Sequence, residues 1–224
     1  SRHAVFFGGA GVSVPSGIPD FRSPDGLAGK KYPYPFEVIL SHEFFFTHTE
    51  EFWNYCFNEL DPSAAKPNAA HIALAELEKR GKLKAVVTQN IDGLHEAAGS
   101  RRVFELHGTA AKGHCVRCGK VYGADAMRVR RPVPRCDCGG LIKPDIVLYG
   151  ESLDESTVEG ACEEIAESDL LIVGGTSLSV YPAAGFISLA RGKKAFINKT
   201  PAPRGSVRFD LEITGDILLL SRLV

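Results

Sequence analysis

The stretch GGAGVSVPSGIPDFRS, residues 8–23, follows directly on an apolar run at Ala4–Phe7. A glycine cluster just after a buried strand is typical of a turn that binds the phosphates of a dinucleotide. The usual spacing of that motif, G-x-G-x-x-G, is incomplete, because Gly9 and Gly11 fit it while Val14 stands at the third position. The stretch therefore predicts a strand followed by a phosphate-binding turn, and the GIPDFR loop beyond it needs a further explanation.

Other apolar runs have the length of buried strands, and segments with a helical pattern lie between them. The expected strands are Ala4–Phe7, Ala85–Thr88, Leu170–Gly174 and Ala195–Asn198, and the expected helices are His71–Arg80, Glu155–Glu167 and Pro182–Arg191. Strands that alternate with helices predict an α/β fold with a Rossmann-like, doubly wound parallel sheet. Ligands of such sheets bind beyond the carboxyl ends of the strands.

Two stretches interrupt this alternation. Residues 25–66 are rich in aromatic residues and proline and predict a helical insertion. Residues 112–141 contain four clustered cysteines and predict a smaller zinc-binding module. The rest of the chain, residues 1–24, 67–111 and 142–224, is expected to form the Rossmann-like domain that binds the dinucleotide.

The composition of the chain limits its partners. The 224 residues carry a formal net charge of −1, and 44% of them are hydrophobic. A nearly neutral chain has no broad electrostatic attraction to nucleic acid or to anionic membranes. No apolar stretch approaches the roughly 18 residues that a membrane span requires, and we find no secretory signal. We therefore expect a cytoplasmic protein without membrane or specific nucleic-acid partners.

Four of the six cysteines form a C-x-x-C pair and a C-x-C pair with 17 residues between them. The candidate zinc ligands are Cys115, Cys118, Cys136 and Cys138. Four thiolates at this separation suit a closed, structural zinc site. The C-x-C pair can converge on the metal if Gly139-Gly140 permits a bend, and His114 is a reserve ligand. The alternative is two unrelated pairs of reduced cysteines.

Polar side chains follow the second expected strand in TQNIDGLH, residues 88–95. Gln89, Asn90 and Asp92 can form hydrogen bonds with ribose hydroxyls and amides at the sheet edge. The alternative is that Asp92 only caps a helix.

His107, in ELHGTA, precedes the cysteine module, where two domains would meet in a cleft. Imidazole is the natural general base near neutral pH, although a lone histidine can equally serve as a structural hydrogen-bonding residue. The remaining histidines that we considered are expected to be solvated helix or loop residues, and these are His42, His48, His71 and His95.

Two later segments complete the set of candidate loops. KPDIVLYGE, residues 143–151, is either an exposed segment that accepts a peptide by strand addition or an ordinary linking strand. GGTSLSVYPAAG, residues 174–185, follows a buried strand and opens a helix, so Thr176 and Ser177 predict an anion site. Asn198 ends another strand, where it can meet a ribose or adenine.

Together these stretches resemble the sirtuins, the NAD-dependent protein deacylases. The matching segments are GAGVSVPSGIPDFR, TQNIDGLH, ELHG, CVRC with CDC, KPDIVLYGE and GTSLSVYPAA, in the order of the family and spread over about residues 4–220. The resemblance implies that the turn Gly9-Ala10-Gly11 cradles the phosphates of NAD, so that a third glycine is not required. The loop beyond it would close over the nicotinamide half.

The resemblance also implies individual roles. Contacts to the phosphates and the riboses are implied for Ala10, Ser13, Arg22, Gly175, Thr176 and Ser177, and Asp20 belongs to the same NAD site. Asn198 and Ile217 would meet the adenosine, Ile18 and Asp92 the nicotinamide, and Gln89 and Asn90 the nicotinamide ribose. Phe21 would cover the ribosyl centre. Val147, Gly150, Glu151 and Val180 would contact the acetylated peptide or protein substrate.

The implied reaction transfers an acyl group. The amide oxygen of an acyl-lysine attacks the ribose carbon and expels nicotinamide, with Asn90 and the general base His107 as catalytic residues. The products would be lysine, nicotinamide and O-acyl-ADP-ribose. Sirtuins that prefer acidic acyl groups carry a Tyr-x-x-Arg pair where this chain has Trp53 and Cys56, so an apolar acyl group such as acetyl is expected.

Three other functions are compatible with parts of this sequence. A protein mono-ADP-ribosyltransferase would use the same NAD site, and it is the main alternative. A nucleic-acid-binding zinc ribbon would need a broader basic surface than this chain has. An NAD(P) oxidoreductase would need the complete glycine motif.

Overall fold

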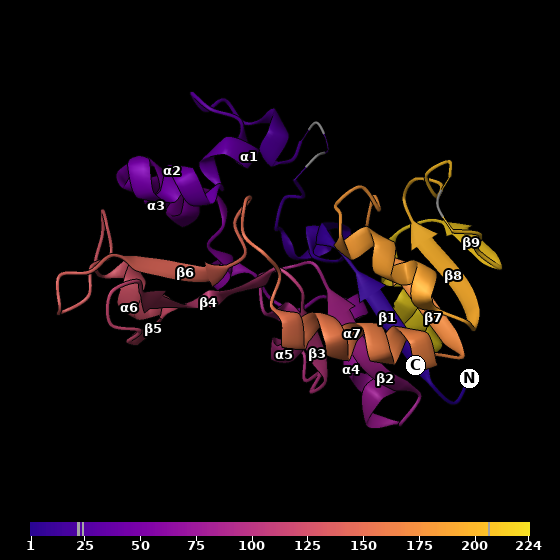
Figure 1. Ribbon diagram of the computed structural model, residues 1–224. Coiled ribbons are helices and arrows are strands. Elements are labelled where there is room, and N and C mark those ends of the chain that lie inside the picture. The colour runs from indigo at the N-terminus through magenta and orange to yellow at the C-terminus, as the bar shows by residue number, and fades with distance from the viewer. Residues whose placement is uncertain (22, 24, 206) are drawn as a thin grey trace.

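The computed structural model describes residues 1–21, 23, 25–205 and 207–224, and its largest unit is a six-stranded parallel sheet (Figure 1). The strands are β1 (Ala4–Gly8), β2 (Leu83–Thr88), β3 (Val103–Glu105), β7 (Leu170–Gly174), β8 (Lys193–Asn198) and β9 (Leu211–Thr214). Their order is β3-β2-β1-β7-β8-β9, and every neighbouring pair is parallel. The strand order runs outward from β1 to β3 on one side and from β7 to β9 on the other, so the doubly wound fold is confirmed. Ligands of such sheets are expected where the order reverses, between β1 and β7.

All five residues of β1 are buried, which explains the continuous apolar run. Its alternate residues face opposite sides, and Val5 and Phe7 belong to one core cluster while Ala4 and Phe6 belong to another. Helix α7 (Glu155–Glu167) covers the first side. The central strand is therefore shielded on both faces, and only its end is open.

The second face is covered by α4 (Ala69–Lys79) and by a 3₁₀ helix at Ile217–Leu223. Another 3₁₀ helix, Ala183–Leu189, joins α7 on the first face. The sequence predicted an α-helix at Pro182–Arg191, so this segment is shorter and more tightly wound than expected. Gly185 lies within it, and glycine lowers helix propensity.

Strands β3 and β9 were not among the predicted strands. Both lie at the edges of the sheet, and most of their side chains are only partly buried or exposed. Edge strands pack on fewer neighbours, so their sequences do not need the continuous apolar run of a central strand.

The two interrupting stretches pack together as a second unit, at the left of Figure 1. Residues 25–66 form three α-helices, α1 (Phe36–Ile39), α2 (His42–Thr47) and α3 (Thr49–Glu59). The cysteine region contributes an antiparallel sheet of β5 (Val121–Gly123), β4 (Gly108–Cys115) and β6 (Ile142–Ile146), with α6 (Ala124–Arg128). Helical content in the insertion is thus confirmed, while the domain boundaries stay a prediction.

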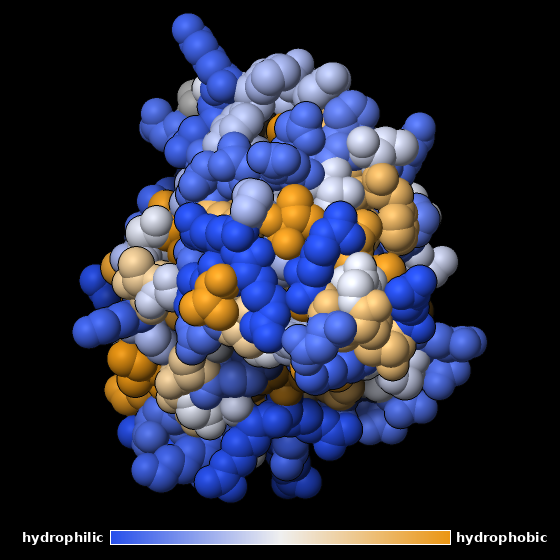
Figure 2. All heavy atoms as spheres, turned by 90° about the vertical axis from the view of Figure 1, so that its left-hand side faces the viewer, coloured by the Kyte–Doolittle hydropathy of each residue, from blue (hydrophilic) through white to orange (hydrophobic). Residues whose placement is uncertain are grey.

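A shared hydrophobic core holds this second unit together. Phe45 and Phe52 from the helices and Tyr122 and Ile142 from the small sheet belong to one buried cluster. Figure 2 shows the outer end of this unit, where small hydrophobic patches lie scattered among hydrophilic residues. Its apolar side chains therefore mostly pack inward, between helices and sheet.

Among the helices of the described residues, none has both the length and the apolar character needed to cross a bilayer.

Candidate active site

One large cavity, of about 1230 Å³, opens at the carboxyl ends of the central strands. Cavities that bind small molecules and cofactors usually measure about 300–1,000 Å³, so this one has room for a dinucleotide beside a second substrate. The predicted site residues that line it are Gly9, Ala10, Gly11, Asp20, Phe21, Gln89, Asn90, His107, Val147, Gly150, Glu151, Gly175, Thr176, Ser177, Val180, Asn198 and Ile217.

Three other predicted residues are placed differently. Ser13, Ile18 and Asp92 do not line the cavity, although Ser13 and Asp92 are hydrogen-bonded to one another directly behind it. Arg22 lies outside the described residues. The individual roles in NAD and peptide binding stay predictions.

Two glycine turns meet at the point where the sheet changes direction. The Gly11 amide donates a hydrogen bond to the Gly175 carbonyl over 2.8 Å. A Cβ atom on Gly11 would lie 2.9 Å from the Gly175 Cα atom. Gly175 has a φ of +61°, and a Cβ there would lie 2.5 Å from the Val12 nitrogen. Both glycines are therefore required by close backbone approach.

The missing third glycine has a structural explanation. After β1 the chain forms two short 3₁₀ helices, Ala10–Val12 and Val14–Ser16, where a Rossmann motif would begin one long α-helix. The third glycine of that motif allows close packing of the helix on the strand. Val14 starts the second short helix and is only partly buried, so its position does not require a glycine.

A Gly11→Ala substitution is expected to lower stability by about 1–3 kcal/mol through overpacking and to raise the KM for NAD. Thermal unfolding and steady-state kinetics measure the two effects. Gly123→Ala is the matched control, since a Cβ on Gly123 meets nothing within 4 Å. A Gly11→Ala protein with unchanged melting temperature and unchanged KM would contradict this role of the turn.

Ser13 is the centre of a buried polar network behind the cavity. Its hydroxyl donates to Asp92 Oδ2 over 2.6 Å and accepts from Asn90 Nδ2 over 3.1 Å. The other carboxylate oxygen, Oδ1 of Asp92, accepts from the amide of Leu94, the first residue of α5 (Leu94–Ala97). Asp92 thus supports the start of a helix and holds Ser13 at the same time.

The third partner of Ser13 is His71, which the sequence analysis did not place in the site. His71 Nδ1 accepts from the Asn68 amide over 3.3 Å, so its proton lies on Nε2, which is 3.4 Å from the Ser13 hydroxyl. Asn68 also donates to the Val12 carbonyl, which ties α4 to the glycine turn. The spacing of Asn68 and His71 at a helix start was the available signal, because it fits a capping box.

The prediction that His71 and His95 are solvated is wrong. Their exposed fractions are 0% and 1%. Burial and, to a smaller extent, the nearby His71 together lower the pKa of His95 to about 3. Both rings pack against each other with centroids 4.7 Å apart, so they belong to the support of the site. A sequence pattern does not reveal this burial, because it arises from the packing of α4 against α5.

His107 faces the cavity with a defined tautomer. Its Nδ1 lies 2.9 Å from the Gln89 carbonyl oxygen, which can only accept, so the proton of the neutral ring lies on Nδ1. Nε2 then carries the free lone pair. Burial lowers the pKa of His107, and the backbone hydrogen bond partly opposes this. The ring is therefore a neutral base at pH 7.

The loop after β7 is tied to the loop after β2. Gln89 Nε2 donates to Thr176 Oγ1 over 3.2 Å, and the same oxygen accepts from the Leu178 amide. Leu178 has a φ of 53°, a left-handed conformation that is rare for a leucine. Such strain is commonly found at binding sites, where the surrounding structure holds it in place.

The segment after β6 passes beside His107. The Val147 amide donates to the His107 carbonyl, and the Tyr149 amide donates to the Leu40 carbonyl, both over 2.9 Å. Val147 and Tyr149 line the cavity, and the Tyr149 side chain is 42% exposed. This segment therefore joins the base, the cavity and the helical insertion.

Some lining residues were missed by sequence reasoning. Tyr181, Lys199 and Thr200 also line the cavity, and Thr200 Oγ1 accepts from Asn198 Nδ2 over 2.9 Å. All three adjoin predicted residues at the ends of β7 and β8, so position alone was the signal.

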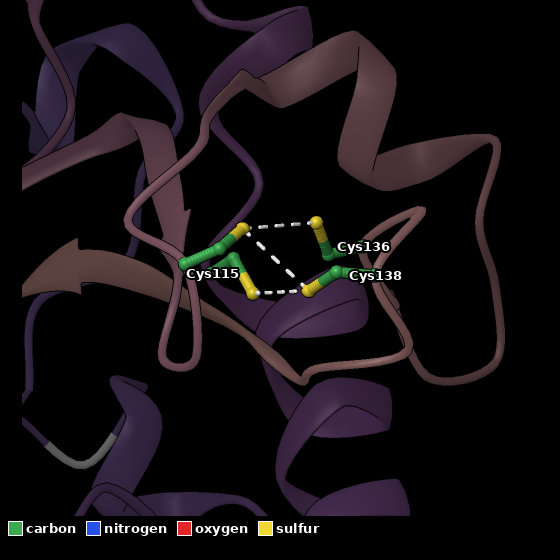
Figure 3. Close-up of side chains that lie close together, drawn as sticks. Cys115, Cys136 and Cys138 are labelled. Carbon is green, nitrogen blue, oxygen red and sulfur yellow. Dashed lines mark hydrogen bonds between the residues drawn. The ribbon is translucent and has the colours of Figure 1, made fainter.

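The four cysteines converge as predicted. All four Sγ atoms lie within 4.8 Å of one another, and the sulfurs of the labelled cysteines point toward a common centre in Figure 3. Three Sγ pairs are 3.5 Å apart. A tetrahedron of thiolates with Zn–S bonds of about 2.3 Å has edges of about 3.8 Å, so the donor set fits zinc.

The neighbours of the cluster explain how a C-x-C pair can take part. Gly139 has a φ of +84°, and a Cβ on Gly140 would lie 2.6 Å from Cys115 Sγ, so both glycines allow the bend. Tyr122 donates its hydroxyl proton to Cys136 Sγ over 3.1 Å. His114 is bonded to Asp145 and does not belong to the cluster, so the reserve ligand is not needed.

The fold and the site together define a class of protein: a nucleotide-binding enzyme with a Rossmann-like sheet, a histidine that lines the cavity and a separate cluster of four cysteines suited to a metal. A family model described as the Sir2 family matches residues 9–182. The chain belongs to this family.

Two relatives and two solved structures illustrate the similarity. A Clostridium acetobutylicum protein named NAD-dependent protein deacetylase is 50% identical over 97% of this chain and 90% of its own length. A Thermotoga maritima protein of the same name is 40% identical over 100% of this chain and 92% of its own length. A structure of Sir2 with a p53 peptide and NAD⁺ matches with a TM-score of 0.89 at 39% identity, over 100% of this chain and 92% of the other. A Sir2 variant with a deacetylated p53 peptide and 3′-O-acetyl-ADP-ribose matches with a TM-score of 0.91 at 39% identity, over 99% of this chain and 92% of the other.

Proposed function

We propose that this chain is an NAD-dependent protein lysine deacetylase, which transfers the acetyl group of an acetyl-lysine to ADP-ribose and releases nicotinamide. One observation carries the proposal. His107, with Nε2 free to accept a proton, lies where the dinucleotide-sized cavity meets the segment after β6. The relatives named NAD-dependent protein deacetylases support it.

The glycine turns and the strand ends would hold NAD. When bound, NAD supplies the ribose carbon that the acyl oxygen attacks and the nicotinamide that leaves. Gly11 and Gly175 line the cavity where the phosphates would bind, and Asn198, which also lines it, would meet the adenosine. Asn90 is held by Ser13, so its amide is fixed in direction before any ligand binds.

His107 would act as the general base. Its neutral ring accepts a proton at Nε2 from the ribose hydroxyl network, while Nδ1 stays bonded to Gln89. The imidazolium that forms keeps its orientation because a carbonyl accepts from Nδ1 in both charge states. The acetylated peptide would lie along Val147, Gly150 and Val180, which line the same cavity.

The cysteine module would have a structural role. The four cysteines would hold zinc without leaving a position for a substrate, so the metal would supply fold stability and no chemistry to the reaction. The same thiolates favour a reducing compartment, so we include a cytoplasmic location in the proposal. The proposed domain boundaries remain those predicted from the sequence.

Acetyl should be preferred over acidic acyl groups. A second cavity of about 40 Å³ shares Leu60, Ile91 and Ile146 with the large one, and Arg128 lies on its wall. Asp61 binds this arginine through both carboxylate oxygens, over 2.7 and 2.9 Å, so its charge is already neutralised. We expect kcat/KM for a succinyl-lysine peptide to be at least about 100-fold below that for the acetyl peptide, since a buried unpaired charge costs several kcal/mol. Comparable rates for the two peptides would contradict this preference.

The direct test of the proposed function is an acetyl-lysine peptide incubated with the protein, with and without NAD. The mass of the peptide is expected to fall by about 42 Da, because one acetyl group is replaced by hydrogen, and only when NAD is present. If NAD is consumed and ADP-ribose is instead attached to protein, the transferase is the correct function.

A further inference from the structure

Lys143 is a buried cation that the proposed reaction does not use. It lies on β6 with an exposed fraction of 9%, and within the described ranges it is the one lysine or arginine classed as buried. Burying an ammonium group is costly unless it is paired and hydrogen-bonded. Its surroundings should therefore show what compensates for the burial.

The ammonium group has three acceptors around it. Nζ lies 3.0 Å from Glu151 Oε2, 2.9 Å from the Ile146 carbonyl oxygen and 3.3 Å from the Pro144 carbonyl oxygen. An ammonium has three N–H donors, so all of them are satisfied. The chain from Pro144 to Glu151 thus wraps around one buried charge.

Glu151 closes this loop. Its Oε2 accepts from the Leu148 amide over 2.9 Å as well as from Lys143, and the Glu151 amide donates to the Leu148 carbonyl. Its carboxylate is therefore directed into the loop, toward Lys143. The resemblance implied that Glu151 contacts the substrate directly. Such a contact would compete with the hydrogen bonds that Glu151 accepts from Leu148 and Lys143.

The loop closed by this pair carries the residues proposed to meet the peptide. Val147, Tyr149 and Gly150 lie on it and line the cavity. One side is bonded to the His107 carbonyl, and the other is bonded to Leu40 of the helical insertion. A change in the loop would therefore move the peptide-binding segment relative to His107.

We propose that Lys143 and Glu151 are positioning residues that hold the segment Ile146–Glu151 in the shape that accepts the acetyl-lysine peptide. The inference rests on the proposed function, since it names the residues that prepare its peptide site. Neither side chain needs to touch the substrate. Their effect is on peptide binding, and NAD binds to glycine turns on other strands.

The test compares Lys143→Met, Glu151→Gln and the double variant Lys143→Met/Glu151→Met. Removing Lys143 leaves the mostly buried Glu151 carboxylate without its cation, whereas removing both charges is milder. Glu151→Gln is the mildest change, because its amide oxygen can still accept from the Leu148 amide and from Lys143. In Lys143→Met we expect the KM for the peptide to rise at least about tenfold, while the KM for NAD changes by less than about twofold. The double variant should recover part of the peptide affinity, and Glu151→Gln should lie between it and wild type.

Lys120→Met is the matched control, because Lys120 precedes β5 of the same small sheet and forms an exposed ion pair with Asp137. It should leave both KM values unchanged. If Lys143→Met does not fold, Glu151→Gln decides, since its amide keeps the bond from Leu148 and loses only the charge. An unchanged peptide KM, or an equal rise of both KM values, overturns the proposal. The proposal is also overturned if Glu151→Gln and the double variant raise the peptide KM equally, and by more than Lys143→Met does. That result would make Glu151 a direct substrate contact.

Peptide binding is also measured without turnover, by fluorescence anisotropy of a labelled acetyl-lysine peptide. Wild-type protein that binds this peptide but does not deacetylate it would overturn the proposed function. The comparison of Lys143→Met with wild type would still decide the positioning role. The two failures are thereby distinguished.

Discussion

His107→Ala is expected to lower kcat for deacetylation by about 10² to 10⁴-fold, the usual contribution of a general base. The KM for NAD should change little, because the glycine turns and the Ser13 network remain. Product formation followed by mass spectrometry measures the loss. His3→Ala is the control, since His3 pairs with Glu164 at the start of β1 and Glu164 keeps its partner Arg102. A His107→Ala protein with wild-type kcat would refute the assignment of the base.

The pH profile of the wild-type protein should agree with this role. Burial holds the pKa of His107 below its usual value of 6.5. A base must be neutral to accept a proton, so kcat/KM should be level near pH 7 and should fall only as the pH drops through this lowered pKa. If kcat/KM already falls as the pH is lowered above pH 6.5, a group other than His107 controls the profile.

Loss of the metal should have the second large effect. The cysteine module shares its core with the helical insertion through Cys115, Cys136 and Tyr122, so its unfolding would expose that core. We expect a strong chelator to abolish deacetylation and to lower the melting temperature, since structural zinc contributes about 10–16 kcal/mol in zinc-finger peptides. Metal analysis should find one zinc per chain before chelation.

Cys136→Ser and Cys162→Ser separate the metal site from general effects of thiol loss. Cys162 lies on α7 outside the cluster, and its variant should keep zinc and activity. Cys136→Ser should lose both. Full activity in a zinc-free Cys136→Ser protein would contradict the structural role of the cluster.

The central strands were predictable for a physical reason. Residues of β1, β2 and β7 are covered on both faces, so nearly every side chain must be apolar, and the pattern is visible in one sequence. β3 and β9 pack on fewer neighbours and carry no such pattern. The glycine turn was also visible, but the reason for its two glycines, the approach of Gly11 to Gly175, lies between segments far apart in the chain.

The site shows the same division. Residues at strand ends, such as Gln89, Thr176 and Asn198, line the cavity because the parallel fold itself brings strand ends together. His71 and Lys143 were not recognised, because each depends on a partner brought by tertiary folding: the Ser13 hydroxyl in one case and the Glu151 carboxylate in the other. A buried polar residue has no periodic pattern, so only its environment reveals it.

In the proposed reaction the acetyl group leaves the lysine for ADP-ribose, and NAD is consumed. Mass spectrometry of a complete reaction mixture tests it most directly by quantifying nicotinamide, deacetylated peptide and O-acetyl-ADP-ribose together. We expect the three products in equal amounts. Deacetylated peptide with free acetate and intact NAD would contradict it.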